Sequence, residues 1–441
     1  MSIGGQQDRS NEGGGYTVSV NQKSVDVLVL GGGAAGVCAA ISAARSGYNV
    51  LLVESQGCLG GSRTATGVDT FYGFYTPKEQ RRIVGGIPWE IAQHLVSQKA
   101  AFERPNTYGA GTGITYDIEM LKIIYERTVL DAGAELLYHT YASVVHTEDG
   151  VISRVVLANK LGLTEVTARM YIDTTGDGDI AARAGAPFEK SDVAELQSLS
   201  TIFFMANVDT TEAKKISHKE LAERMKAANQ SGQYVLPREE GSWHVTPHPG
   251  VIQANMVRVS GIDATDPYAL TLAEVEGRQQ TQQYVNFLKA YVPGFENAFL
   301  ISTSHHIGVR ETRRILGEYI LTEDDVVNGR KFEDGIACCG APVEDHGAGK
   351  DTRWVYVAGD GHYHIPYRSL LPTGVNNLLV AGRCLSATHG AQASARNSAQ
   401  CMAMGQAVGV AASLAIERQE AVRQIPAYRL QELLREQGAI V

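Results

Sequence analysis

The chain has 441 residues, of which 44% are hydrophobic and 20% are charged, a balance typical of a globular protein with two or three domains. The formal net charge of -9, without a basic segment longer than a pair of residues, argues against a nucleic-acid partner. Each apolar run is shorter than the roughly 20 residues that a membrane-spanning helix needs, so we expect no membrane span. The first residues resemble no export signal, and we expect a cytoplasmic protein.

Residues 1–24 are rich in Gly, Asn and Gln, and we expect them to form a flexible tail. The six cysteines contain no Cys-x-x-Cys pair, so their spacing predicts neither a zinc site nor an iron–sulfur cluster. Adjacent Cys338 and Cys339 could form a strained disulfide, but a buried pair of reduced thiols is the interpretation that we favour.

The first ordered elements form a β–α–β unit. Residues 25–30 are an apolar strand, a glycine-rich loop follows, and a helix extends to about residue 46, where Gly47 ends it. Residues 50–53 are a second strand that ends at Glu54. A strand, a crossover helix and a second strand of this length indicate a parallel sheet.

The rest of the chain returns to the same domain after an irregular middle. A helix is expected at 117–132, and three strand-like runs follow at 135–147, 151–159 and 164–170. Residues 377–381 form a last strand, and residues 394–416 form a long helix of small residues. We therefore expect one discontinuous domain of residues 25–186 and 356–441, into which residues 187–355 are inserted as a substrate domain.

The glycine-rich loop carries the dinucleotide fingerprint. Gly31 makes the tight turn, Gly33 lets a pyrophosphate approach the backbone, and Gly36 lets the helix pack closely on the strand. The N-terminus of the helix offers amide groups and a positive dipole to the phosphates. Glu54 stands where a carboxylate accepts hydrogen bonds from an adenosine ribose.

Three further motifs favour FAD over NAD. Gly60 and Gly61 follow Glu54 closely, a second motif covers residues 173–179, and a third covers residues 378–383. With the stretches 308–315, 365–370 and 381–389, these motifs resemble those of the FAD-dependent oxidoreductase family called FAD_oxidored. Fumarate reductase and heterodisulfide reductase flavoproteins are more distant relatives of this kind.

The resemblance implies an α/β fold, with a three-layer Rossmann-type FAD-binding domain like that of glutathione reductase and an inserted α+β substrate domain. It implies an enzyme that binds FAD through Gly31, Gly33, Ala34, Ala35, Gly36, Glu54, Ser55, Gly60, Gly61, Ser62, Arg63, Thr64, Val144, Thr175, Gly176, Asp177, Gly382, Arg383 and Ser394. Relatives that bind flavin covalently have a histidine where this chain has Arg63, so we expect non-covalent FAD. Arg63 could stabilise anionic reduced flavin or be a structural residue.

The catalytic candidates lie near the last strand. His389 is the candidate proton acceptor, with flavin contact and a structural role as alternatives, and His364 is the next candidate base. Tyr367 is expected at the flavin face, and Arg310 is expected to orient the substrate, although a structural role for its cluster is equally open. His362 and His364 would point the same way on a strand, but without supporting ligands at metal-site spacing we expect no metal.

These features predict the transfer of a hydride to flavin N5 from a polar small molecule, at a C–H bond next to a hydroxyl or an amine. A sugar, a polyol or a hydroxy acid would fit. No second dinucleotide fingerprint is present, so electrons are expected to leave to oxygen, a quinone or a protein, and the acceptor is left open. Two alternatives remain, reduction of an activated alkene and a non-redox or tRNA-modifying role, and a homo-oligomer is also left open.

Overall fold

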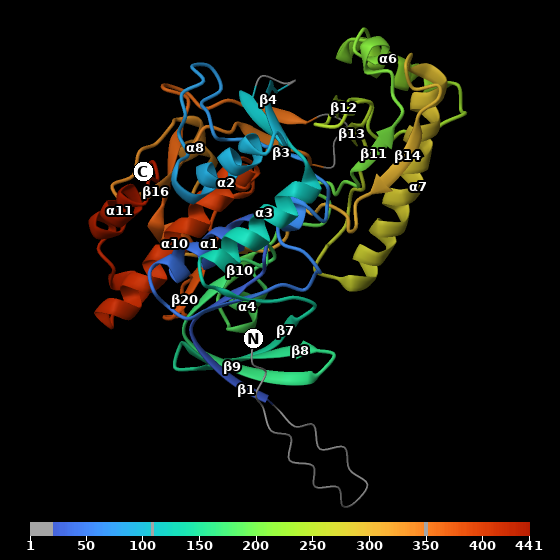
Figure 1. Ribbon diagram of the computed structural model, residues 1–441. Helices are drawn as coiled ribbons and strands as arrows, with labels where there is room; N and C mark the ends of the chain where they lie inside the picture. The colour runs from blue at the N-terminus through green and yellow to red at the C-terminus, as the bar shows by residue number, and fades with distance from the viewer. Residues whose placement is uncertain (1–20, 107–109, 348–351) are drawn as a thin grey trace, which may run out of the picture.

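The computed structural model describes residues 21–106, 110–347 and 352–441, which have a mixed α/β fold (Figure 1). The strands are β1 (Asn21–Leu30), β2 (Val50–Val53), β3 (Thr70–Phe71), β4 (Ala101–Pro105), β5 (Thr112–Tyr116), β6 (Glu135–Leu137), β7 (Tyr141–Glu148), β8 (Val151–Asn159), β9 (Gly162–Asp173), β10 (Phe188–Glu189), β11 (Phe203–Ala206), β12 (Ser242–Val245), β13 (Ile252–Asn255), β14 (Phe299–Thr303), β15 (Arg314–Ile315), β16 (Gly335–Cys339), β17 (Val343–Asp345), β18 (Arg353–Val355), β19 (Tyr363–Pro366) and β20 (Leu378–Val380). The helices are α1 (Ala34–Arg45), α2 (Gly86–Ser97), α3 (Ile118–Asp131), α4 (Asp179–Arg183), α5 (Thr210–Ala213), α6 (His218–Gln230), α7 (Pro267–Tyr291), α8 (Glu323–Val327), α9 (His389–Ala395), α10 (Ser398–Arg418) and α11 (Ala427–Glu436).

The centre of the molecule is a parallel sheet that begins with the predicted β–α–β unit. Strands β2 and β9 flank β1, β6 lies beside β2, and β20 lies beside β9, all in parallel. The register sets Leu30 beside Val53 on one side and beside Asp173 on the other, so the strands end together. Ligands of open parallel sheets bind outside this carboxyl edge, and the segments that carry the three predicted flavin motifs leave β2, β9 and β20 there.

Successive residues of β1 face two different cores, because side chains alternate along a strand. Val27 and Val29 belong to the core that includes α1 and α10, whereas Leu28 and Leu30 belong to the core beneath the antiparallel meander of β7, β8 and β9. The sheet therefore lies between a helical layer and the meander, which is visible at the bottom of Figure 1. The long strand β9 takes part in both the sheet and the meander.

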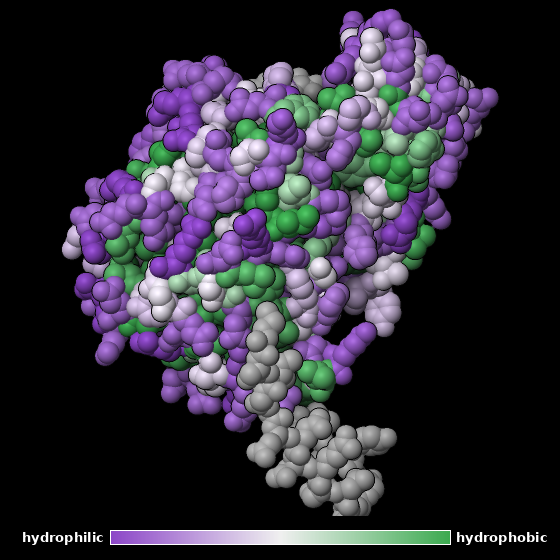
Figure 2. Space-filling model, viewed as in Figure 1, coloured by the Kyte–Doolittle hydropathy of each residue, from purple (hydrophilic) through white to green (hydrophobic). Residues whose placement is uncertain are grey.

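Helix α10 crosses α1 at close range because glycines leave room for the backbone. A Cβ added to Gly405 would lie 2.1 Å from the Ala35 carbonyl oxygen, and one added to Gly409 would lie 2.5 Å from the Ala39 carbonyl oxygen. By length and composition, α10 could cross a membrane, although the sequence led us to expect no such helix. In its most apolar 18-residue stretch, 94% is buried inside the protein, as in the core helix of a globular protein. On the face shown in Figure 2, hydrophobic residues are scattered among hydrophilic ones.

A second hydrophobic core lies between the helices α6 and α7 and the antiparallel sheet β12-β13-β11-β14, at the upper right of Figure 1. Its buried members extend from Leu199 to Ile307. Phe332 and Val343, which lie within the predicted insertion of residues 187–355, pack into the first core instead. The separately packed unit is thus narrower than the predicted insertion.

Three predicted elements differ in the structure. The strand-like run of residues 135–147 is two strands, β6 beside β2 and β7 in the meander. Strand β1 begins at Asn21, because residues 21–24 extend its pairing with β9; the remaining residues of the predicted tail, 1–20, lie outside the described residues. The predicted helix of residues 394–416 is two helices, α9 and α10. They separate because Asn397 has an extended backbone and its side-chain amide donates a hydrogen bond to the Ser394 carbonyl.

The crossing of α1 and α10 predicts a specific sensitivity to side-chain size. Gly405→Val should lower the free energy of unfolding by about 1–3 kcal/mol, because the new side chain would overlap the α1 backbone. The matched control Ala403→Val, at a half-buried position of the same helix, should cost less than about 1 kcal/mol. Urea unfolding followed by circular dichroism measures both, and equal losses would contradict the close crossing.

Candidate active site

The turn between β1 and α1 is shaped by close backbone contacts. Gly31 has φ +102°, and a Cβ there would lie 2.5 Å from the Thr174 carbonyl oxygen. A Cβ on Gly36 would lie 1.8 Å from the Gly31 carbonyl oxygen, whereas one on Gly33 would meet nothing within 4 Å. No side chain caps α1, so the amide groups of Ala34 and Ala35 face the open space at Gly33. This is the arrangement that a bound pyrophosphate requires.

Glu54 stands at the carboxyl end of β2 and lies against the same loop. Its Oε2 accepts a hydrogen bond of 2.7 Å from the Gly32 amide, and its Oε1 accepts bonds of 2.8 Å from the Gln56 amide and 2.9 Å from the Ser55 hydroxyl. The side chain is buried. These bonds hold the carboxylate in one position beside the glycine loop.

The Gly60–Gly61 segment runs beside the first loop. Gly33 and Gly60 form a parallel bridge, and a Cβ on Gly61 would lie 3.3 Å from the Gly33 Cα. Arg63, which follows, is half-buried and donates a hydrogen bond of 3.1 Å to the Thr70 carbonyl. The structure therefore brings the first two predicted motifs together.

The second and third motifs meet through an ion pair. Arg383 Nη2 lies 2.9 Å from Asp177 Oδ1, and a Cβ on Gly176 would lie 2.8 Å from the same guanidinium nitrogen. A Cβ on Gly382 would lie 3.2 Å from Ala35 Cβ, at the start of α1. The segments before α4 and after β20 therefore close around the start of α1, as their sequence motifs predict.

Two arginines lie in a polar interior between the two cores. Arg310 Nη1 donates to the Ser198 carbonyl and to Ser200 Oγ, and Arg396 Nη2 donates to Gln197 Oε1 and to the Glu344 carbonyl. Both side chains are half-buried, and none of the described carboxylates lies within ion-pair distance of either. Burial lowers the pKa of both guanidinium groups, and the charge of Arg396 lowers that of Arg310 further. The charge of Glu344, which lies outside ion-pair distance, opposes this shift at both arginines.

Glu344 and His346 form a hydrogen-bonded pair in the same interior. His346 Nε2 lies 2.9 Å from Glu344 Oε1. Burial and the charge of Arg310 lower the pKa of His346 to about 3, so this imidazole is neutral near pH 7. Burial alone would raise the pKa of Glu344, but the bond from His346 and the arginine charges hold it at about 2.

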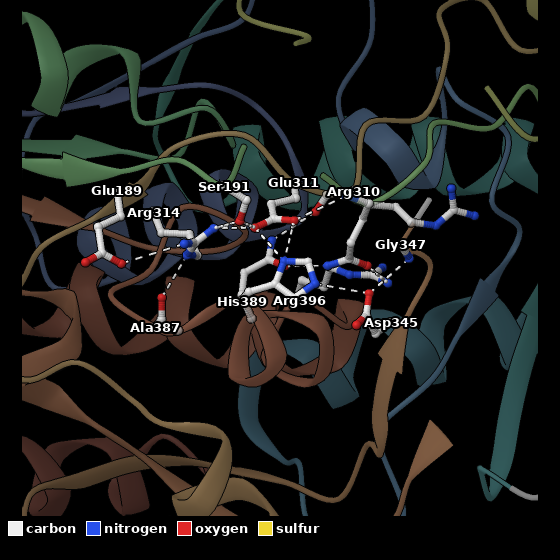
Figure 3. Close-up of polar contacts among 12 residues, drawn as sticks. Glu189, Ser191, Arg310, Glu311, Arg314, Asp345, Gly347, Ala387, His389 and Arg396 are labelled. Atoms are coloured by element: carbon white, nitrogen blue, oxygen red, sulfur yellow. Dashed lines mark hydrogen bonds and ion pairs between the residues drawn. The ribbon is translucent and has the colours of Figure 1, made fainter. Parts of the chain in front are cut away.

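His389 is held between two carboxylates (Figure 3). Its Nδ1 lies 2.8 Å from Glu311 Oε2, and its Nε2 lies 3.1 Å from Asp345 Oδ1. The bonds to Asp345 and Glu311 raise the pKa of His389 to about 9 despite its partial burial. Glu311 also pairs with Arg314, which in turn donates to the Ala387 carbonyl. The predicted role of His389 as a neutral proton acceptor stays a prediction, but in this geometry both ring nitrogens are engaged and the raised pKa favours the charged ring near pH 7.

Comparison with known proteins decides the family. The model of the family described as FAD dependent oxidoreductase matches residues 26–434. The chain belongs to this family. It is an oxidoreductase enzyme, and its cofactor is FAD.

Individual relatives of this FAD-dependent oxidoreductase match over shorter segments. A digeranylgeranylglycerophospholipid reductase of Methanospirillum hungatei is 31% identical over 164 residues, which are 35% of this chain and 39% of that protein. A thiamine thiazole synthase of Methanococcus aeolicus is 27% identical over 176 residues, which are 38% of this chain and 60% of that protein. The match thus spans less than two thirds of each relative.

Solved structures resemble the whole chain at low identity. A geranylgeranyl bacteriochlorophyll reductase-like protein from Thermoplasma acidophilum has a TM-score of 0.47 and 15% identity, covering 95% of this chain and 85% of that one. A flavin-dependent brominase has a TM-score of 0.48 and 10% identity, covering 93% of this chain and 83% of its own.

The residues around the glycine loop fit the dinucleotide part of FAD. The open space at Gly33, the uncapped start of α1 and the fixed carboxylate of Glu54 suit a pyrophosphate and an adenosine ribose. Gly382 and the pair of Asp177 and Arg383 would lie beside the rest of the cofactor. FAD would supply the hydride chemistry, and these residues would hold it.

Several predicted residues lie away from these loops or point elsewhere. Tyr367 is buried and its hydroxyl donates a hydrogen bond of 2.9 Å to the Val422 carbonyl, so the prediction that it reaches the flavin face is wrong. Ser394 is fully buried and donates to the Ala341 carbonyl at 2.6 Å, which argues against its predicted contact with FAD. His364 lies on β19 opposite Cys338, apart from Arg310 and its partners.

The structure gives the positions of the other residues that we expected to contact FAD, but it does not test those contacts. Ser62 is exposed beside Arg63, and Thr64 is buried with its hydroxyl donating to the Leu59 carbonyl. Val144 is half-exposed on β7 of the meander, and Thr175 bonds to the buried Asp173. Their contacts with FAD stay predictions.

The structure adds a histidine–carboxylate pair that the sequence did not indicate. His244 on β12 places Nε2 at 2.8 Å from Oδ1 of Asp69, a buried residue just before β3. The second oxygen, Asp69 Oδ2, is buried with no partner among the described residues. Burial raises the pKa of Tyr72, and the charges of Glu344 and Asp69 add to the rise, so both carboxylates act on this one ring. Only the fold could reveal the pair of His244 and Asp69, because the two residues are far apart in sequence.

The role of Glu54 predicts weaker cofactor binding after charge reversal. Glu54→Arg should weaken FAD binding about 10- to 100-fold, because charge-assisted hydrogen bonds worth roughly 1.5–3 kcal/mol would be lost. Titration of the apoprotein with FAD, followed by flavin fluorescence, measures the change. Glu148→Arg, an exposed charge reversal at the end of β7, is the control. Equal affinities for the two variants would exclude Glu54 from the cofactor site.

The raised pKa of His389 predicts a pH-dependent stability. Its ordinary pKa is 6.5 and its folded value is about 9, so the contribution of the charged ring is complete below about pH 6.5 and is lost as pH rises through about 9. The stability difference between the wild type and His389→Gln should therefore shrink by on the order of 2 kcal/mol across that window, after allowance for partial exposure. Urea unfolding at several pH values measures it, and a difference independent of pH would refute the ion triad.

Proposed function

We propose that this enzyme removes a hydride from a polar small molecule that carries an anionic group. The observation that supports the proposal is the pair Arg310 and Arg396, whose hydrogen-bond partners are all neutral. A partly buried cation loses hydration, and without an ion-pair partner this loss is only partly offset here by the charge of Glu344. A carboxylate or phosphate of the substrate would supply that charge, and guanidinium groups bind such anions through paired hydrogen bonds.

FAD supplies the acceptor for a hydride from a C–H bond next to a hydroxyl or an amine. The chain must then hold the substrate and take the proton of that hydroxyl or amine. Arg310 and Arg396 would fix the anionic end. His244 would accept the proton at Nδ1 while Nε2–H donates to Asp69, which sets the tautomer of the ring.

The proposal includes the domain arrangement and the partners. We infer a FAD domain of the glutathione-reductase type, in which the unit around the second core covers the flavin as an inserted substrate domain. The three layers around the parallel sheet and the separate core from Leu199 to Ile307 support this arrangement. The substrate would then enter between the two units, and the partners would be this small molecule and an external electron acceptor.

Reduction of an activated alkene is the second candidate function. The local identity of 31% with a reductase of digeranylgeranylglycerophospholipid favours it. In that direction His244 would donate a proton to the carbon next to the one that receives the hydride. The two functions differ in whether a substrate reduces or oxidises the bound flavin.

Anaerobic stopped-flow measurements of the flavin absorbance test the proposal. A panel of hydroxy acids, amino acids, sugar phosphates and uncharged polyols is mixed with oxidised enzyme, and activated alkenes are mixed with reduced enzyme. We expect flavin reduction by anionic compounds only. Reduction by uncharged polyols at equal rates would refute the anion site, and oxidation by alkenes alone would establish the second candidate.

Variants separate substrate binding from proton transfer. Arg310→Ala should raise the substrate concentration for half-maximal reduction about 10- to 100-fold, and the exposed Arg278→Ala is its control. His244→Asn should slow flavin reduction about 10²–10⁴-fold at saturating substrate. His248→Asn is the matched control, because His248 forms a similar pair with Asp117 on the surface. Equal rates for His244→Asn and His248→Asn would remove His244 from the reaction.

A further inference from the structure

Three side chains with metal-binding atoms converge outside the flavin motifs and the polar interior. The ligand atoms of Cys338, His362 and His364 all lie within 4.8 Å of one another. Cys338 and His362 are buried, and His364 is half-buried. The fold alone assembles this cluster, because the thiol comes from β16 and the imidazoles come from the segment that forms β19.

The strand geometry directs all three side chains to one face. Cys338 pairs with His364 in the antiparallel register of β16 and β19, so the two residues lie on the same face. Alternation along the chain places His362 on that face as well and turns Tyr363 to the other. Tyr363 bonds to Ser394 there at 2.8 Å. Glycine makes room for the cluster, since a Cβ on Gly335 would lie 2.7 Å from His364 Nδ1.

Outer contacts leave the same ring nitrogen of each imidazole for a ligand. His364 Nδ1 lies 3.4 Å from the Phe332 carbonyl and can donate a proton to it, which leaves Nε2 as an acceptor. His362 Nδ1 lies 3.1 Å from Asp360 Oδ1 and 3.2 Å from Arg81 Nη2. When Nδ1–H donates to Asp360, instead of Nδ1 accepting from Arg81, Nε2 of His362 is also free. A histidine that binds a metal typically donates its second nitrogen to a carboxylate or a carbonyl in this way.

We propose that Cys338, His362 and His364 bind a zinc ion, with water in the fourth position. One thiolate and two imidazoles are suitable ligands for Zn²⁺, and three protein ligands leave one exchangeable position. Binding would release the thiol proton of Cys338 to solvent and create the zinc–sulfur bond without any redox change. Asp360, which also pairs with exposed Lys331 and Arg81, would offset part of the added charge. The inference does not depend on the proposed function.

Metal analysis of the FAD-loaded protein tests the site. The protein is first treated with a chelator and then dialysed against ZnCl₂, and we expect about one tightly bound zinc per chain. X-ray absorption at the zinc edge should show one sulfur at about 2.3 Å and two nitrogens at about 2.0 Å. No stoichiometric zinc, or a first shell without sulfur, would overturn the proposal. Preferential binding of Cu(I) over zinc would overturn the choice of metal.

Substitutions assign the ligands. Cys338→Ser and His364→Gln should each weaken zinc binding more than about 100-fold, which exceeds the 10- to 100-fold effect expected for the outer-contact variant Asp360→Asn. Cys339→Ser is the matched control, since Cys339 lies on the opposite face beside Ser394 and should keep full affinity. Flavin content and circular dichroism identify variants that do not fold, and His362→Gln then replaces a failed variant. Unchanged zinc affinity in folded ligand variants would refute the site.

Discussion

The whole carboxyl edge of the sheet depends on how closely the turn after β1 approaches the strand β9. The Thr174 hydroxyl donates to the carbonyls of Leu30 and Gly31, at 3.0 and 2.7 Å, so turn and strand are joined at the point where Gly36 brings α1 closest. Gly405 lets α10 reach the first turn of the same helix. Because no larger residue fits at these contacts, the start of α1, the end of β9 and the helix α10 are held together by the protein's own contacts.

The interior above this edge shows two ways of holding charge. Around His389 every charge has an opposite partner. Glu311 pairs with Arg314, Asp345 pairs with Arg353, and each ring nitrogen of His389 bonds to one of the two carboxylates. Around Arg310 and Arg396 the contacts are to neutral groups. The first arrangement stabilises the segment that joins β20 to α9. The second leaves both guanidinium groups without an ion-pair partner, although the charge of Glu344 acts on both. This contrast distinguishes the closed triad from the candidate binding site.

The sequence predicted the sheet and the cofactor loops well because their signals are local. The glycine spacing of Gly31, Gly33 and Gly36 and the position of Glu54 need only a strand and a helix to become a site. The surroundings of the catalytic candidates could not be predicted in the same way. The charge state of His389 depends on Glu311 and Asp345, which approach from other segments, and the pair of His244 and Asp69 joins residues from two packed units. Periodicity within one element carries no information about such neighbours.

Strand β9 belongs to both the parallel sheet and the meander, and this limits the order in which the strands can pair during folding. β1 pairs with β2 as soon as the first β–α–β unit is made, but its other edge pairs with β9, residues Gly162–Asp173, more than a hundred residues later. During synthesis this edge of β1 therefore has no partner strand until β9 has been made, and the pairing of β9 with β20 comes later still. Contacts of such long range slow folding, so a nascent chain should need shielding from aggregation until β9 emerges. The ion pair of Asp177 and Arg383, which joins the second and third motifs, can form only after Arg383 has been made, late in synthesis.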